Sequence, residues 1–171
     1  MATMTKSINT MEDLLHLELQ ELYSIEQQVI EAMPRLAKMA SSQELRTDMQ
    51  EHLEQTKQQK QRLEHIFELL DVQPEAHEVK ALGVMLQETE QMLQSIQDED
   101  IRDAALIGAA QKVEHLEIAG YGTARAHALE ADLDDIAEIL QQTLDEEGET
   151  DELLTEAAEA DINVRAAQRD S

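Results

Sequence analysis

The sequence predicts an all-α fold: a bundle of four long helices in two hairpins, joined by one long crossover that carries a short extra helix. Three observations support this prediction. The chain has 171 residues, enough for a single domain with a buried core. Its five glycines and two prolines are few, whereas Leu, Ala, Glu and Gln, which favour helices, are abundant. Apolar residues also recur every three or four positions over four long stretches.

The first long helix is expected over residues 11–40. Met1 to about Ile8 is expected to be an unstructured lead-in, after which Asn9 or Thr10 can cap the helix with a side-chain oxygen. Pro34 removes one backbone hydrogen bond and predicts a kink, but no helix end, because the apolar pattern continues beyond it. That pattern comprises Leu15, Leu19, Leu22, Val29, Met33 and Leu36.

The second helix is expected over residues 43–70. It follows a short turn at Ser41 and Ser42, so it should run antiparallel to the first. Residues 71–80 contain the second proline and break the helical pattern, and a shorter helix follows at 81–97. One long connection between two antiparallel helix pairs is the arrangement of ferritin-like bundles, so we expect a ferritin-like four-helix bundle.

The third and fourth long helices should form the second hairpin. The third is centred on residues 104–128, and a turn near residues 129–134 leads into the fourth at 135–162. Gly148 weakens the helical propensity within the fourth helix, and we expect the chain to fray from Val164 onward. We therefore expect one domain over residues 1–171, with flexible ends at 1–8 and about 165–171.

The composition argues against several classes of function. Binding to a nucleic-acid backbone needs Lys and Arg, but the chain has 13 of these against 38 Asp and Glu, a formal net charge of -25. Metal cations are therefore more natural partners than nucleic acid. The absence of cysteine excludes thiolate ligands and fits a reducing compartment. Because we find neither a membrane-spanning run nor a signal peptide, we expect a cytoplasmic protein.

Five polar residues are predicted to point into the bundle. Glu26 and His52 lie within the apolar sides of the first and second helices. Glu114 and Glu117 share the most apolar face of the third helix, and Glu147 lies near that of the fourth. Buried acids are costly unless a positive charge lies between them. Carboxylates with an imidazole between facing helices suit iron or manganese, bound as a pair of ions with shared carboxylates.

Each of these residues also has a simpler explanation. A helical histidine such as His52 is more often hydrogen-bonded to a neighbour, here Thr56, and Glu26 alone could pair with Arg or Lys. His115 follows Glu114 but points about 100° away around the helix, toward the surroundings of the site or a dimer interface. Taken together, the five inward groups favour a metal site, because a plain apolar core does not explain them.

The spacing departs from the usual di-iron pattern. Di-iron bundles carry Glu-x-x-His on two helices. Here Met49 lies three positions before His52, and Leu144 lies three before Glu147, which leaves fewer ligands than the usual set. Glu51 and Asp151 could supply further oxygens only if the helices have a different register.

Two tyrosines accompany the inward acids. Tyr23 lies one turn before Glu26, and Tyr121 lies one turn after Glu117. We expect both phenols to orient carboxylates by hydrogen bonds or to act as redox buffers. The alternative is that they fill polar corners of the core.

Four segments resemble the YciE/YciF-like family of bacterial stress proteins, within the ferritin-like superfamily. They are QELYSIEQQ with MPRLAKMA, HLEQTKQQKQRLEHIFELL, DAALIGAAQKVEHLEIAGYGTARAHA and LQQTLDEEGETDELL, and KVEHLEIAGYGT is the most specific part. The resemblance covers about Met11 to Leu154. It implies a rubrerythrin-like bundle, commonly a homodimer, with a dinuclear iron-type site and induction under stress. The family's recurrent polar positions fall on Glu26, His52, Glu114, Glu117 and Glu147.

Two functions follow as alternatives. The first is a cytoplasmic stress protein that binds two iron or manganese ions and uses them in peroxide or oxygen detoxification or in iron handling. Such a protein would be a di-iron or di-manganese oxidoreductase that acts on peroxide or oxygen. The second is a non-enzymatic, homodimeric helical-bundle interaction protein with no metal or only a structural ion, whose clustered acids stay partly protonated.

Overall fold

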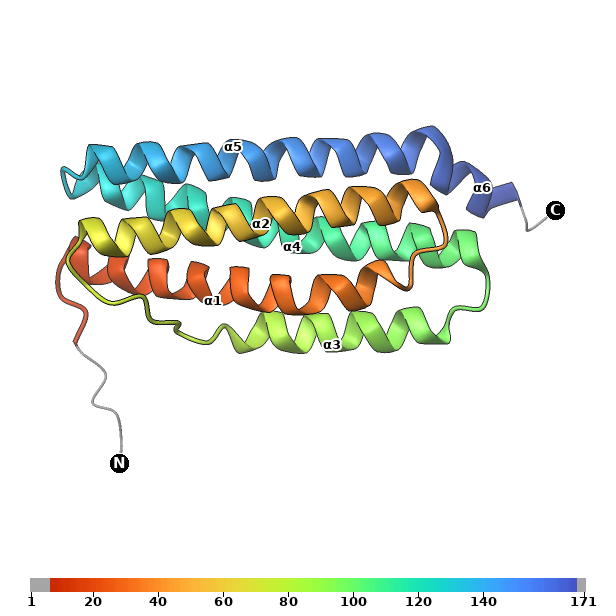
Figure 1. Cartoon of the computed structure of the whole chain (residues 1–171), viewed down its shortest axis with the longest axis horizontal. Coiled ribbons are helices and arrows are strands. Elements are labelled where there is room, and N and C mark those ends of the chain that lie inside the picture. The colour runs from red at the N-terminus through yellow and green to blue at the C-terminus, as the bar shows by residue number, and fades with distance from the viewer. Residues whose placement is uncertain (1–6, 169–171) are drawn as a thin grey trace, which may run out of the picture.

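A computed structural model describes residues 7–168 as helices and connecting loops (Figure 1). Four long helices form the bundle: α1 (Met11–Ala37), α2 (Gln43–Leu69), α4 (Glu99–Glu130) and α5 (Asp134–Ala157). Helices α1 and α2 form one antiparallel hairpin, and α4 and α5 form the other, with α1 packed against α4 and α2 against α5. The predicted all-α bundle of two hairpins is confirmed.

The long crossover connects the two hairpins and carries the short helix α3 (Lys80–Ser95), as predicted. This helix lies along the outside of the bundle and packs against α1 and α4 (Figure 1). The residues before it are fastened to α1, because the His77 N–H donates to the Gln20 carbonyl at 3.0 Å and the Val79 N–H donates to Ser24 Oγ at 3.2 Å. Gln28 Nε2 also donates to the Val79 carbonyl at 3.3 Å.

The helix ends follow their capping residues more closely than the apolar pattern. The Thr10 side chain caps α1, and α1 continues through Pro34 to Ala37. Helix α4 begins at Glu99, earlier than expected, because the Asp98 side chain accepts hydrogen bonds from the backbone N–H groups at the helix start. Asp132, with φ 58°, occupies the left-handed region in the turn between α4 and α5.

The C-terminal part of the chain is more helical than the sequence led us to expect. A π-helical turn (Ala158–Ile162) follows α5, and a further helix α6 (Asn163–Gln168) packs against α4. Ala158, Ile162 and Ala166 are buried there, and their contacts explain why the chain does not fray at Val164. The expected flexible ends fall partly on residues 1–6 and 169–171, which lie outside the described residues.

A buried aspartate joins the two hairpins near the turn between α1 and α2. Asp103 of α4 is 1% exposed, and its two carboxylate oxygens accept from the backbone N–H groups of Ser41 and Ser42, both at 2.7 Å. The neighbouring Arg102 donates to the Met39 carbonyl at 2.9 Å and to Ser41 Oγ at 2.7 Å. These contacts hold the first hairpin turn against the start of α4.

Close approach of α1 and α4 fixes the middle of the bundle. A Cβ added at Gly120 would lie 2.9 Å from Leu22 Cδ2, so only glycine fits there without movement of the leucine. The core around this contact consists mainly of Leu, Ile, Met and Ala side chains. Across residues 7–168, no helix combines the length and the apolarity that crossing a membrane requires.

Candidate metal centre

Four glutamates converge in the middle of the bundle, and a histidine lies beside them. Glu26 of α1, Glu114 and Glu117 of α4 and Glu147 of α5 are each no more than 2% exposed. The side chain of His52, on α2, is 13% exposed. The sequence predicted an inward orientation for all five, and the structure confirms it. Each residue shares a helix face with core side chains, so packing of the apolar stripes carries the polar groups inward.

Three of the five residues form a compact group. One ligand atom each from His52, Glu114 and Glu147 lies within 4.8 Å of the others. His52 Nε2 is 3.1 Å from Glu114 Oε1. Burial by itself would lower the pKa of His52, but the hydrogen bond and the charge of Glu114 raise it in net. Glu26 and Glu117 are not part of this three-residue group, although their charges affect its titration.

The glutamates have few hydrogen-bond donors. The Tyr121 hydroxyl donates to Glu26 Oε1, and Gln59 Nε2 donates to Glu147 Oε1. Among the described residues, no hydrogen bond reaches the Oε2 atoms of Glu26, Glu114, Glu117 and Glu147. A buried carboxylate oxygen without a donor is costly, so a bound cation would stabilise this arrangement of four such oxygens.

Burial makes it difficult for these carboxyls to ionise together. It raises the pKa of Glu26 to about 8, although the hydrogen bond from Tyr121 opposes this shift. Burial and the charge of Glu117 raise the pKa of Glu147 to about 12. Burial, followed by the charges of Glu26 and Glu114, raises the pKa of Glu117 well above its ordinary value. Without a cation, burial therefore favours the protonated form of these carboxyls over the ionised form.

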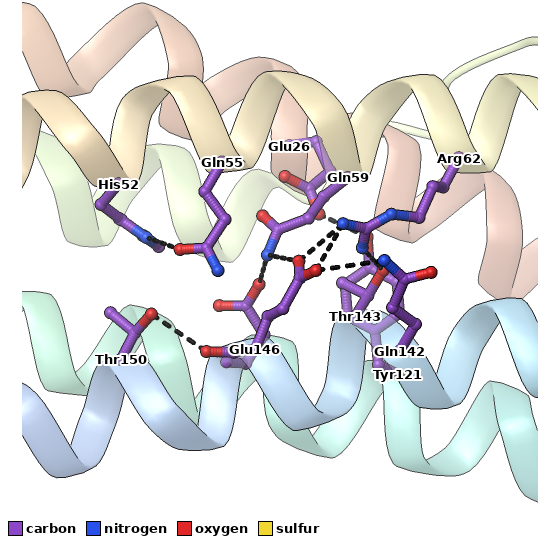
Figure 2. A network of polar contacts seen from close by, with 11 residues as sticks. Glu26, His52, Gln55, Gln59, Arg62, Tyr121, Gln142, Thr143, Glu146 and Thr150 are labelled. Atoms are coloured by element: carbon purple, nitrogen blue, oxygen red, sulfur yellow. Dashed lines mark hydrogen bonds and ion pairs between the residues drawn. The ribbon is translucent and has the colours of Figure 1, made fainter.

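One arginine approaches the cluster but pairs with a different acid. Arg62 of α2 lies 2.6 Å from Glu146 Oε1 and donates to Thr143 Oγ1 at 2.6 Å (Figure 2). Its charge lowers the pKa of Glu26, but by less than burial raises it. The simpler explanation in which a basic side chain pairs with Glu26 therefore accounts for a small part of its environment.

Sequence reasoning missed a row of polar residues on α2. Gln55, Gln59 and Arg62 follow His52 at intervals of three or four positions, so all four lie along one side of the helix (Figure 2). Gln59 is 1% exposed and bridges toward α5, where its amide also donates to Glu146 at 3.3 Å. This spacing was visible in the sequence, but the abundance of glutamine in this stretch hid it.

Other predicted contacts differ from the structure. The Tyr23 hydroxyl donates to Glu64 at 2.8 Å, so Tyr23 does not orient any of the five candidate ligands. The Thr56 hydroxyl donates to the backbone carbonyl of His52, and the imidazole contacts Glu114 instead of Thr56. His115 is largely exposed, with Nε2 3.9 Å from Asp151.

The two acids considered as substitute ligands also lie elsewhere. Glu51 is exposed on α2. Asp151 accepts a hydrogen bond from Gln111 at 3.2 Å. Neither acid joins the cluster. The helices thus present the same faces to the core that the sequence predicted, without the change of register that would bring Glu51 or Asp151 inward.

Comparisons with known proteins agree with the fold. The family model described as Domain of unknown function (DUF892) matches residues 10–167. Protein YciF of Escherichia coli strain K12 is 34% identical over 164 residues, covering 95% of this chain and 99% of YciF.

Solved structures give the same result. The crystal structure of the E. coli stress protein YciF superposes with a TM-score of 0.86 at 35% identity, covering 91% of this chain and 99% of that one. YcfI from Rhodopseudomonas palustris superposes with a TM-score of 0.86 at 36% identity, and the match covers 90% of this chain and 98% of YcfI. A Xanthomonas campestris protein superposes with a TM-score of 0.75 at 26% identity, and the match covers 94% of this chain and 99% of that protein. The chain therefore belongs to the DUF892 family, together with the stress protein YciF.

Proposed function

We propose that this chain is a ferritin-like stress protein that binds two iron or manganese ions and uses them in peroxide or oxygen chemistry. One observation carries the proposal: four buried glutamate oxygens without hydrogen-bond donors meet in one cluster. Two divalent ions would offset the charge that makes this arrangement costly. The membership in a family that includes a stress protein supports the physiological part of the proposal.

The residues present fit such ions. Carboxylate oxygens with one imidazole suit iron and manganese better than softer metals that prefer thiolates. His52, Glu114 and Glu147, which already lie together, would hold one ion. Glu26 and Glu117 would supply oxygens to the second. Ion binding would replace the protons that the carboxyls otherwise hold, so affinity should increase with pH.

Neighbouring side chains would keep the ligands in place. The hydrogen bond from Tyr121 fixes one oxygen of Glu26 and leaves the other free, and Gln59 does the same for Glu147. A bound pair of ions would supply two one-electron redox changes to a peroxide or oxygen molecule.

Metal uptake tests the proposal directly. Untagged protein is loaded anaerobically with iron(II), and bound iron and the absorption spectrum are measured before and after peroxide. We expect about two ions per chain in the wild type, from the two-ion precedent of such bundles, and a spectral change on oxidation. A Glu114→Ala, Glu117→Ala variant should take up far less. If it takes up as much iron as the wild type, the proposal is wrong.

A matched control separates the cluster from general negative charge. Glu149 and Glu152 are two exposed acids three positions apart on α5, so Glu149→Ala, Glu152→Ala changes the net charge by the same amount. This control should load like the wild type. Iron or manganese should also raise the melting temperature of the wild type by about 5–10 °C at concentrations well above Kd, and magnesium should not.

The second candidate function is a metal-free, homodimeric interaction protein. The positions of Glu114 and Glu147 favour it, because one oxygen of each lies within 4.8 Å of the other, and two buried carboxyls this close can share a proton without an ion. Under this alternative, wild type and the double variant take up equally little iron. Light scattering on the untagged protein tests the proposed homodimer in either case.

A further inference from the structure

A large cavity leads to one side of the glutamate cluster. Its volume is about 730 Å³, and residues from α1, α2, α4 and α5 line it together with part of α3. Apolar side chains form most of the wall, among them Val29, Met33, Met49, Leu106, Val113 and Leu154. His52 and Glu114 also line it, so the cavity reaches two residues of the cluster, whose side chains lie 3.1 Å apart.

The cavity is much larger than a peroxide or oxygen molecule requires. A water molecule takes about 30 Å³ of liquid volume, so hydrogen peroxide would need roughly 60 Å³. The observed volume lies in the range of small-molecule binding pockets, about 300–1,000 Å³, which are mostly apolar with a few polar groups that fix orientation. The apolar wall and the polar end formed by His52 and Glu114 match that description.

The charges that line the cavity restrict the ligand further. Glu44, Asp48, Glu51, Glu54 and Glu156 belong to the lining, and within the described residues no Lys or Arg does. Their field repels anions from the entrance. A charged group of either sign would also lose its hydration among the apolar side chains farther in. The ligand should therefore be uncharged.

The position of the polar end favours a small molecule over a second protein chain. Glu114 is 2% exposed, so a ligand must be narrow to reach it. A helix from another chain is about 10 Å across with its side chains and could only cover the entrance.

We propose that this cavity binds an uncharged, elongated apolar molecule whose single hydrogen-bonding end lies against His52 and Glu114. A neutral organic hydroperoxide or a long-chain alcohol has this chemistry. Binding of such a molecule does not depend on the function proposed above. The further step, that the molecule is a substrate of the cluster, rests on that proposed function.

The test uses N-phenyl-1-naphthylamine, an uncharged dye whose emission increases in apolar surroundings. Metal-free, full-length protein should bind the dye, and 1-octanol should displace it. Octanoate, which differs by its negative charge, should displace it at least about tenfold less well at low salt, and the gap should narrow in 1 M salt. Absence of dye binding, or equal displacement by octanoate, would overturn the proposal.

A cavity-filling variant tests whether the dye binds in this cavity. Ala110 lines the cavity on α4, and Ala110→Leu should weaken dye binding about fivefold or more. Ala119 is exposed on the same helix, so Ala119→Leu should bind like the wild type. If Ala110→Leu does not fold by circular dichroism, Ala157→Leu on α5 serves instead. Undiminished binding in the folded cavity variant contradicts the proposal.

Two further measurements distinguish the outcomes. If a second copy of the chain occupies the entrance, dye binding should decline as light scattering shows dimer formation, and the small-molecule proposal is then wrong. Iron uptake by the same variants separates this inference from the proposed function. Ala110→Leu should bind the dye about fivefold more weakly and keep the iron, while Glu26→Ala, Glu117→Ala, at two candidate ligands that do not line the cavity, should lose the iron and keep the dye.

Discussion

Asp103 and Glu114 are both buried acids on α4, yet their surroundings differ completely. Both oxygens of Asp103 accept from backbone N–H groups at 2.7 Å, so its burial is compensated within the fold. Glu114 contacts His52 through one oxygen, and its other oxygen has no hydrogen-bond donor among the described residues. Burial of an acid therefore does not identify a functional site. Unsatisfied oxygens that several helices bring together are the more informative sign.

The largest expected difference between the two regions is in their response to pH. Because the pKa of Glu26 is raised from 4.5 to about 8, the folded state holds a proton that the unfolded state releases in this range. The free energy of unfolding of metal-free protein should thus be highest below about pH 4.5 for this group and decrease as pH rises to 8, by up to about 5 kcal/mol. Urea unfolding in EDTA at pH 5 and 8 measures this loss.

Two variants assign that pH dependence to the cluster. Glu26→Gln cannot ionise and should reduce the slope, whereas Asp103→Asn, which also removes one buried acid, should retain it. A slope in Glu26→Gln equal to that of the wild type would show that Glu26 does not contribute to it.

The second prediction concerns stability at the hairpin junction. Asp103→Ala leaves the backbone N–H groups of Ser41 and Ser42 without their acceptors, and should lower the free energy of unfolding by about 3 kcal/mol. Urea unfolding at pH 7 gives the value. Iron uptake by the folded variant should remain that of the wild type. A loss of iron binding would mean that the two regions are not independent.

The third prediction concerns the ligands. Glu117→Gln keeps the size of the side chain but removes its charge, so it should weaken manganese(II) binding about 100-fold. Titration followed by electron paramagnetic resonance measures free manganese. Gln111→Glu, at a half-buried position two turns earlier on α4, adds a charge outside the cluster and should leave the affinity within about threefold. Equal affinity in wild type and Glu117→Gln would remove Glu117 from the site.

The smallest expected effects come from the two tyrosines. Tyr121→Phe removes the donor to buried Glu26 and should cost about 1–2 kcal/mol of stability at pH 8 and weaken metal binding. Tyr23→Phe removes a bond to the partly exposed Glu64 and should cost less than about 1 kcal/mol with no change in metal binding. Parallel thermal melts with and without manganese compare them. If manganese raises the melting temperature of both variants equally, Tyr121 does not support metal binding more than Tyr23 does.

Most of the fold follows from the sequence because helical periodicity is a local signal. The inward orientation of Glu26, Glu114, Glu117 and Glu147 was predictable, since each shares a face with apolar neighbours on its own helix. Helix ends were less predictable where a capping side chain or a packing contact decides them. Asp98 starts α4 early, and contacts of the buried Ile162 keep the C-terminal part helical.

Contacts between helices were harder to predict from spacing. Tyr23 and Tyr121 each lie one helical turn from an inward acid, but the rotation of α1 turns Tyr23 toward Glu64 on α2. Gln59 and Arg62 depend in the same way on how α2 faces α5. The relative rotation of two helices depends on packing over their whole length, and a single sequence gives little information about it.

The hydrogen bond between Tyr121 and Glu26 also gives the protein a built-in optical signal. The chain has no tryptophan and only two tyrosines, so its near-ultraviolet absorption and fluorescence come almost entirely from two phenols. One of them contacts the carboxylate cluster, and the other contacts Glu64 near the surface. A Tyr23→Phe protein would therefore report the state of the cluster through a single chromophore, without any added label.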